Sequence, residues 1–202
     1  MAIRHPGASP HQGEWSAYHG KQMSEAQFLS IDDAEETDLE YVDGTAAEKG
    51  MVDRNHRLLA RELDGRLWLY CKENGGESGP EGRVRLPTGR YRKPDVAYWK
   101  PGIPSGNDSV PTLAVEVRSP GETMASQREK CREYRAAGAE VVWLIDPISR
   151  SVEVFEGQAD AEPVPADGIL TSEHLPGLEV SSAELFAILG QPDGAPRARG
   201  KD

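Results

Sequence analysis

Two acidic residues stand where a buried strand would normally carry apolar side chains. Asp95 opens the apolar run PDVAYW at residues 94–99, and Glu116 lies within the run TLAVEVRS at residues 112–119. A buried charge without a partner is costly, so each carboxylate needs a hydrogen bond, a cation or a metal ion. If the two runs are neighbouring strands, which lie under about 5 Å apart, the carboxylates would repel each other unless a hard cation lay between them. Such an ion could polarise a phosphate and activate a water molecule.

A lysine follows on the next predicted helix, at residues 122–139. The side of this helix that we expect to be buried carries Met124, Cys131, Tyr134 and Gly138. Lys130 lies about 40° from Tyr134 on a helical wheel, at the edge of that side. From there its amine could reach over the strand ends and stabilise phosphate charge or hold an attacking water molecule.

Each of these residues also has a structural interpretation. Asp95 could cap the turn that precedes its strand. Glu116 could form an ion pair with Arg118 or Arg92, and Lys130 could be a solvated surface lysine. Arg118 itself could contact phosphate or serve only as the structural partner of Glu116.

Asp146 and the scattered histidines are weaker candidates for a functional site. Asp146 precedes Pro147 and is interpreted as a turn residue. The histidines outside the central region, including His174, are scattered and suggest no zinc site.

The elements that would position these residues form a mixed set of helices and strands. Helices are predicted at residues 23–31, 55–76 and 122–139 and at the end of 175–189, where Ser182, with Ser181 as the alternative, would be the N-cap. Strands are predicted at 83–87, 94–99, 112–119, 140–147 and 150–157, and Asp43-Gly44 predicts a hairpin within 39–50. This order indicates an α/β (α+β) fold, a mixed central sheet flanked by helices with added β-hairpins.

The length and composition favour one intracellular domain. We expect a single domain at residues 23–189, with residues 1–22 and 190–202 disordered. No apolar run approaches the roughly 20 residues of a membrane helix, and the start of the chain has no signal-peptide core, so no membrane association is expected. Cys71 and Cys131 are the two cysteines. We interpret them as reduced thiols of a cytoplasmic protein.

The charge distribution limits how the protein could bind nucleic acid. A net charge of −11 excludes a protein that binds nucleic acid with its whole surface. Eight acidic residues and no Lys or Arg lie between Asp32 and Glu48, and the rest of the chain carries −3. Six basic residues and one acid lie between Arg83 and Lys100. A local basic face is therefore compatible with the acidic total.

The segments KPDVAYW, LAVEVRSP and REKCREYRAAGAEVVWLIDP together resemble the Uma family of putative restriction endonucleases, within the PD-(D/E)XK nuclease superfamily. LEYVDGTAAEK followed by NHRLLARELDGRL is similar to the start of that family. The resemblance covers roughly residues 24–188. It implies a restriction-endonuclease-like core and metal-dependent cleavage of DNA.

The resemblance also implies roles for particular residues. Asp95 and Glu116 would be metal ligands. The superfamily's usual lysine, two residues after the glutamate, is replaced here by Arg118, and the lysine of the Uma family would be Lys130 on the following helix. Arginine binds phosphate but is too basic to exchange protons near neutral pH.

Three more positions match ones typical of the family. These are Glu40 and Glu48 in the acidic hairpin and His56 at the start of a helix. Glu40 or Glu48 would complete a metal site. The alternatives remain that the two glutamates belong to a solvated acidic face and that His56 is an ordinary residue of a helix N-terminus.

The resulting functional prediction is a metal-dependent endodeoxyribonuclease. Mg²⁺ or Mn²⁺ would be held by Asp95, Glu116 and the carbonyl of Val117, with Lys130 orienting water or stabilising the charged phosphate. DNA phosphates would be gripped by Arg90, Arg92, Lys93 and His56. Because enzymes that cut both strands commonly work as dimers, a homodimer is one expectation.

Two other classes of function remain open. One is a catalytically inactive nuclease-fold module that binds nucleic acid or a protein partner, which the acidic total and Arg118 favour. The other is a nuclease-like structural protein that binds no nucleic acid, which the net charge of −11 favours.

Overall fold

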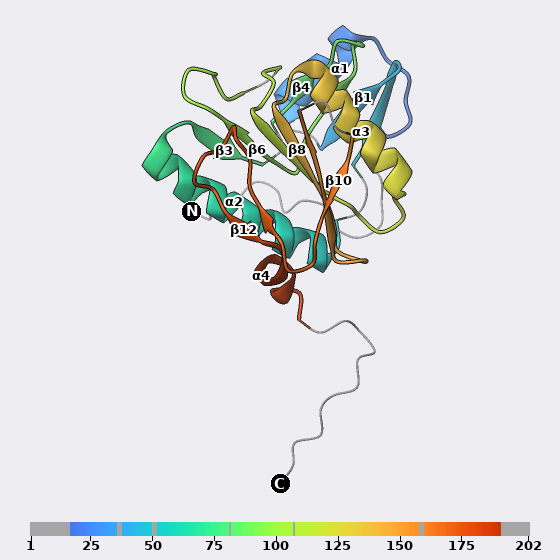
Figure 1. Ribbon diagram of the computed structural model, residues 1–202. Coiled ribbons are helices and arrows are strands. Elements are labelled where there is room, and N and C mark those ends of the chain that lie inside the picture. The colour runs from blue at the N-terminus through green and yellow to red at the C-terminus, as the bar shows by residue number, and fades with distance from the viewer. Residues whose placement is uncertain are drawn as a thin grey trace, which may run out of the picture. The chain divides into compact units, whose positions relative to one another are not determined.

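The computed structural model describes residues 17–35, 38–49, 52–80, 82–106, 108–157 and 160–190 (Figure 1). Contacts divide the chain into two compact units, Met1–Lys49 and Gly50–Asp202. The segments predicted to be disordered lie mostly outside the described residues. Residues 17–22 are described, and there the Gly20 N–H donates to the Ala46 carbonyl at 2.8 Å. The single domain at residues 23–189 stays a prediction.

The first unit contains a helix and the predicted hairpin. Its elements are α1 (Glu25–Glu35), β1 (Leu39–Val42) and β2 (Thr45–Glu48). Ser24 and Gln27 cap α1 reciprocally, since the Gln27 N–H donates to Ser24 Oγ at 3.3 Å and the Ser24 N–H donates to Gln27 Oε1 at 2.9 Å. Asp43 and Gly44 have positive φ angles of 50° and 83°, as a tight two-residue hairpin turn requires. The helix runs four residues beyond its predicted end at residue 31.

The second unit is built on a six-stranded mixed sheet, which confirms the predicted fold class. Its order is β10-β9-β8-β7-β6-β3, from β3 (Glu77–Gly79), β6 (Val96–Trp99), β7 (Leu113–Val117), β8 (Val141–Asp146), β9 (Ser151–Glu156) and β10 (Glu162–Val164). Strands β7 and β8 are parallel, and the other neighbours are antiparallel. Helix α3 (Met124–Ala137) supplies the crossover that a parallel pair needs.

Helices cover both faces of this sheet (Figure 1). Strand alternation sends Val115 and Val117 of β7 to one face, where they pack with Leu59, Leu63 and Leu67 of α2 (Arg54–Asn74) and with α4 (Ser182–Ala187). The opposite face carries Ala114, Val142 and Leu144, which pack with Cys131 and Tyr134 of α3. Each face therefore brings a different helix to the residues of β7.

The remaining strands of the described residues are short and form two hairpin-like pairs. They are the hairpin β4 (Val84–Arg85) with β5 (Tyr91–Arg92), and β11 (Ile169–Leu170) with β12 (Val180–Ser181). The sequence did not predict strands β3, β5, β10 and β11, because two or three residues are too few to show a periodic pattern.

The cap of the last helix is Ser181, whose hydroxyl accepts the Glu184 N–H at 3.3 Å. The preferred prediction of Ser182 was wrong, since Ser182 is the first helical residue and is fully buried. Cys71 and Cys131 are free thiols. None of the helices in the described part of the chain combines the length and the hydropathy that a bilayer crossing requires.

Candidate active site

Asp95 immediately precedes β6 and bonds to β7, the strand that carries Glu116. The Asp95 N–H donates to the Val115 carbonyl at 2.9 Å, and Asp95 Oδ2 accepts the Val117 N–H at 2.7 Å. Strands β6 and β7 are antiparallel neighbours, with Val96 opposite Val115. The expected pairing of the two acidic strands is therefore confirmed. Asp95 is also more than a turn cap, since its side chain bonds to the neighbouring strand.

The other oxygen of Asp95 faces helix α2. Asp95 Oδ1 lies 3.3 Å from His56 Nε2, and His56 Nδ1 lies 3.0 Å from Ser119 Oγ. His56 is placed by the N-cap of α2, where Asp53 Oδ1 accepts the His56 N–H at 2.8 Å. Asp95, His56 and Ser119 are all buried. The structure thus gives His56 a contact with Asp95, and sequence patterns gave no sign of the Ser119 contact.

Glu116 contacts helix α3. Its Oε2 accepts a hydrogen bond from Lys130 Nζ at 3.0 Å, and its Oε1 accepts one from Tyr134 Oη at 2.9 Å. Glu116 is 2% exposed and Lys130 is 7% exposed. The solvated-lysine interpretation is wrong, and the ion-pair partner of Glu116 is Lys130. The role of Tyr134 could have been found from the helical wheel, which places it one turn from Lys130 on the buried side.

Arg118 belongs to a separate buried pair. Its guanidinium donates to Asp146 Oδ1 from Nε at 3.0 Å and from an Nη at 2.7 Å, and it also donates to the Glu122 carbonyl at 3.0 Å. Asp146 is more than a turn residue, although it also accepts the Ile148 N–H at 3.0 Å. Burial raises the pKa of the Asp146 carboxyl, but hydrogen bonds from Ser149, Ile148 and Arg118 outweigh burial and hold that pKa below its ordinary value.

Asp146→Asn should therefore destabilise the protein at neutral pH. We expect a loss of about 1–3 kcal/mol in the free energy of unfolding, because a hydrogen-bonded charge is removed. The wild-type advantage is present above the ordinary carboxyl pKa of 3.8 and disappears as the pH falls through the lower pKa of the folded protein. Urea unfolding of both proteins at pH 7 and near pH 3 measures this. A difference that stays constant or grows toward acid pH would contradict it.

The basic segment before Asp95 is largely engaged with acidic partners. Arg90 and Arg92 both contact Glu133 of α3, the Arg92 Nε donating to Glu133 Oε2 at 2.9 Å. Arg83 Nε pairs with Asp108 Oδ1 at 3.0 Å. Lys93 is 6% exposed. The predicted DNA contacts of Arg90, Arg92 and Lys93 stay predictions, and these positions offer less open positive charge than the sequence indicated.

Glu40 and Glu48 lie in the hairpin of the first unit and point to opposite sides of it. Glu40 pairs with Ala47, and Glu48 pairs with Leu39. Residues directly opposite each other share a face and successive residues alternate, so the two glutamates have opposite faces. Glu40 is buried and Glu48 is half-buried. Their roles as metal ligands stay predictions, and one ion on one face of the hairpin would engage only one of them.

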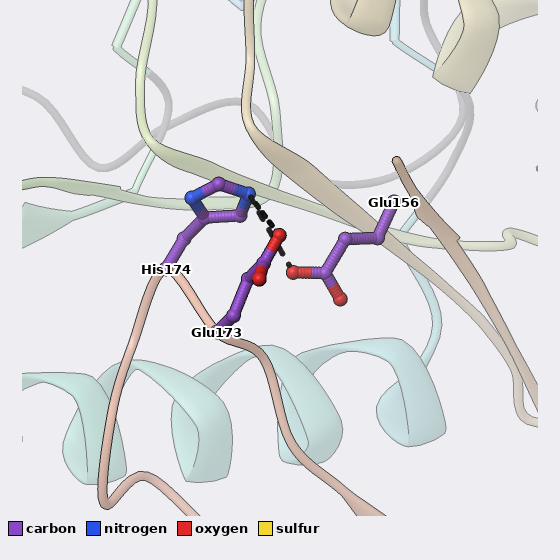
Figure 2. A group of neighbouring side chains, drawn as sticks. All are labelled: Glu156, Glu173 and His174. Atoms are coloured by element: carbon purple, nitrogen blue, oxygen red, sulfur yellow. Dashed lines mark ion pairs between the residues drawn. The ribbon is translucent and has the colours of Figure 1, made fainter. Parts of the chain in front are cut away.

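A second group of possible metal ligands lies apart from the predicted residues (Figure 2). One ligand atom each from Glu156, Glu173 and His174 lies within 4.8 Å of the others. His174 Nδ1 is 2.9 Å from Glu140 Oε2, and its Nε2 is 3.7 Å from Glu156 Oε1 and from Glu173 Oε1. The group is partly exposed, and exposed acidic groups are common without an ion. It nevertheless shows that His174 is not isolated from other potential ligands.

The donor set at Asp95 and Glu116 suits a hard divalent cation. Asp95 and Glu116 supply carboxylate oxygens, which act only as acceptors when ionised. Oxygen ligands of this kind, together with a backbone carbonyl such as that of Val117, are what Mg²⁺ and Mn²⁺ prefer. The residues present therefore fit such an ion, with Lys130 beside Glu116 as a source of positive charge at the same place.

Comparisons with known proteins give a consistent result. A family model described as "Uma2: Putative restriction endonuclease" matches residues 25–185. A solved structure described as a putative nuclease belonging to DUF820, from Anabaena variabilis, is 21% identical with a TM-score of 0.72, over 83% of this chain and 99% of that one. A DrdV–DNA complex is 12% identical with a TM-score of 0.38, over 66% of this chain and 12% of that one. No curated protein matches the chain.

Proposed function

The chain belongs to the Uma2 family of restriction-endonuclease-like proteins, and from that premise we propose that it is a metal-dependent nuclease that hydrolyses phosphodiester bonds of DNA. The observation that supports this most directly is the pair of buried carboxylates on adjacent strands, with Lys130 Nζ 3.0 Å from Glu116 Oε2. Buried carboxylates and a lysine at one place are costly for folding, so a functional reason for them is expected.

In this proposal Asp95, Glu116 and the Val117 carbonyl hold Mg²⁺ or Mn²⁺. When bound, the ion would polarise the phosphate and make a water molecule more acidic. Lys130 would stabilise the negative charge that grows on the phosphate oxygens. The water oxygen bonds to phosphorus while the bond from phosphorus to one sugar oxygen breaks, and that sugar oxygen takes up a proton.

His56 and Tyr134 have positioning roles in the proposal. His56 contacts Asp95 Oδ1 from α2, and Tyr134 donates to Glu116 Oε1 from α3. Each carboxylate is therefore oriented by a residue from a different helix. DNA as the substrate, the homodimer and the cytoplasmic location remain predictions.

The alternative is a catalytically inactive module on the same fold. It is favoured by Arg118, which stands two residues after Glu116 and is held by Asp146 instead of facing the carboxylates of the site. Such a module would bind nucleic acid or a protein partner without turnover.

Incubation with supercoiled plasmid DNA separates the two possibilities. With Mg²⁺ or Mn²⁺ we expect conversion to nicked and linear forms, and with EDTA we expect none, because the ion supplies several kcal/mol of stabilisation to the transition state. Electrophoresis of a time course is the measurement. Cleavage that continues in EDTA would contradict metal dependence, and no cleavage with either ion would favour the inactive module.

A further inference from the structure

One exposed face of helix α2 carries four positively charged side chains and no acidic one along most of its length. At about 100° per residue these positions fall within about 80° of one another on the helical wheel. We call this row the α2 stripe, and it consists of Arg54, Arg57, Arg61, Gly65, Trp68 and Lys72. All six are exposed, and the buried residues of α2 occupy the opposite side. The stripe is about 27 Å long at 1.5 Å per residue.

The cations of the stripe have no carboxylate partners among the described residues. These cations are Arg54, Arg57, Arg61 and Lys72. The Arg57 Nη1 donates to the Val52 carbonyl at 2.9 Å. By contrast, cations elsewhere in the unit are paired with acids, among them Arg83, Arg90, Arg92, Lys100 and Arg118. Arg135 and Arg150 donate to backbone carbonyls, so the row of exposed cations without carboxylate partners lies on α2.

An aromatic side chain interrupts the cations. Trp68 is 53% exposed, and Lys72 Nζ lies 4.7 Å from the centre of its ring system. Asp64, the nearest acid, is half-buried and lies about 40° from Trp68 on the wheel. Glu62, on the other flank, pairs with Arg66 at 2.8 Å. Cations that alternate with an exposed aromatic ring are typical of surfaces that bind single-stranded nucleic acid, where phosphates contact the cations and a base stacks on the ring.

The stripe begins at the N-terminal end of α2, the same end from whose buried side His56 contacts the candidate site. Arg54 is two residues from His56, whose Nε2 lies 3.3 Å from Asp95 Oδ1. The N-terminal end of α2 is also the positive end of its helix dipole. A nucleic-acid strand bound along the stripe would therefore reach the end of α2 from which His56 contacts Asp95.

We propose that the α2 stripe binds a single-stranded segment of the nucleic acid, with Arg54, Arg57 and Arg61 contacting phosphates and Trp68 stacking on an unpaired base. This inference rests on the proposed nuclease function, since it concerns how that function's substrate is held. A single strand is favoured over a duplex because the bases of a duplex stack on each other and leave no face for an indole. Binding of nucleic acid to the stripe requires no cleavage, so it can be measured when the nuclease reaction is blocked.

The test compares binding of a short fluorescein-labelled single-stranded DNA with binding of a matched hairpin duplex, by anisotropy in EDTA. The variant Arg54→Gln with Arg61→Gln removes two cations, and Arg128→Gln with Arg132→Gln is the matched control on α3, where both arginines already pair with acids. We expect the first variant to bind the single strand at least about tenfold more weakly at low salt. The slope of log affinity against log salt should fall in magnitude by about 1.4. The control should bind like the wild type.

Trp68 tests the stacking part. Trp68→Ala should weaken single-strand binding by about 5- to 100-fold and change duplex binding little, and Trp68→Phe should restore much of the affinity. Equal loss on the duplex, or no effect of Trp68→Ala, would overturn the single-strand assignment. Stripe and control variants that bind alike, or a wild type that binds neither DNA, would overturn the stripe. Binding along the stripe with no metal-dependent cleavage would support the stripe and contradict the nuclease function.

Discussion

Asp95→Asn is expected to lower the rate of DNA cleavage by about 10²–10³-fold while the protein remains folded. Asparagine has the shape of aspartate, and its carbonyl oxygen can still accept the Val117 N–H that Asp95 Oδ2 accepts at 2.7 Å. It has no negative charge, which is what a hard cation requires of its ligands. A loss of about 3–4 kcal/mol in transition-state stabilisation corresponds to this reduction, since each 1.36 kcal/mol changes a rate tenfold.

Two measurements check this prediction. Single-turnover cleavage at saturating Mg²⁺ gives the rate, and calorimetric titration with Mg²⁺ or Mn²⁺ gives the loss of ion binding. The group of Glu156, Glu173 and His174 could add heat of its own to the titration. Glu156→Gln is therefore the matched control, and it should leave cleavage unchanged. Cleavage at the wild-type rate in Asp95→Asn would remove Asp95 from the site.

Lys130→Met is expected to cost about 3–5 kcal/mol in the free energy of unfolding, and Glu116→Gln in the same chain should restore most of it. The single change takes away the cation that lies 3.0 Å from a carboxylate that is 2% exposed. Breaking a buried ion pair from one side carries this order of cost, whereas replacing both charges is often nearly neutral. Glutamine keeps an oxygen that can accept the Tyr134 hydroxyl, so the packing around it is preserved.

Urea unfolding of the wild type, both single variants and the double variant measures the coupling energy directly. Tyr134→Phe is the control, because it removes one hydrogen bond to Glu116 and leaves the ion pair intact. We expect the double variant to be stable but inactive in cleavage. A double variant no more stable than Lys130→Met would show that the pair contributes net stability and is not retained for function alone.

Local patterns in the sequence predicted the framework of the site well. Alternation along residues 112–119, which follows from the period of two in a strand, placed Glu116 on the face opposite Val115. The predicted pairing of the two strands placed Asp95 beside β7. The helical period predicted α2 and α3 to within about two residues of the observed bounds Arg54–Asn74 and Met124–Ala137.

The partners of the charged residues could not be predicted in the same way. Arg118 pairs with Asp146 and Arg90 with Glu133, across sequence separations of 28 and 43 residues. Such pairs depend on how strands and helices pack, which periodicity does not specify. The α2 stripe was readable from the sequence, since its six positions follow the period of a helix.

The β7-α3-β8 connection has a consequence for how the site assembles. Glu116 lies 14 residues from Lys130 and 18 residues from Tyr134, so one short segment contains a complete charged contact. Closing a short loop costs little chain entropy, and contacts between near neighbours form early in folding. Asp95 and His56 join from more distant segments, with 63 residues between His56 and Ser119. The contacts of Glu116 with Lys130 and Tyr134 can thus form before Asp95 and His56 reach the site. Glu116 and Lys130 then enter the core already paired.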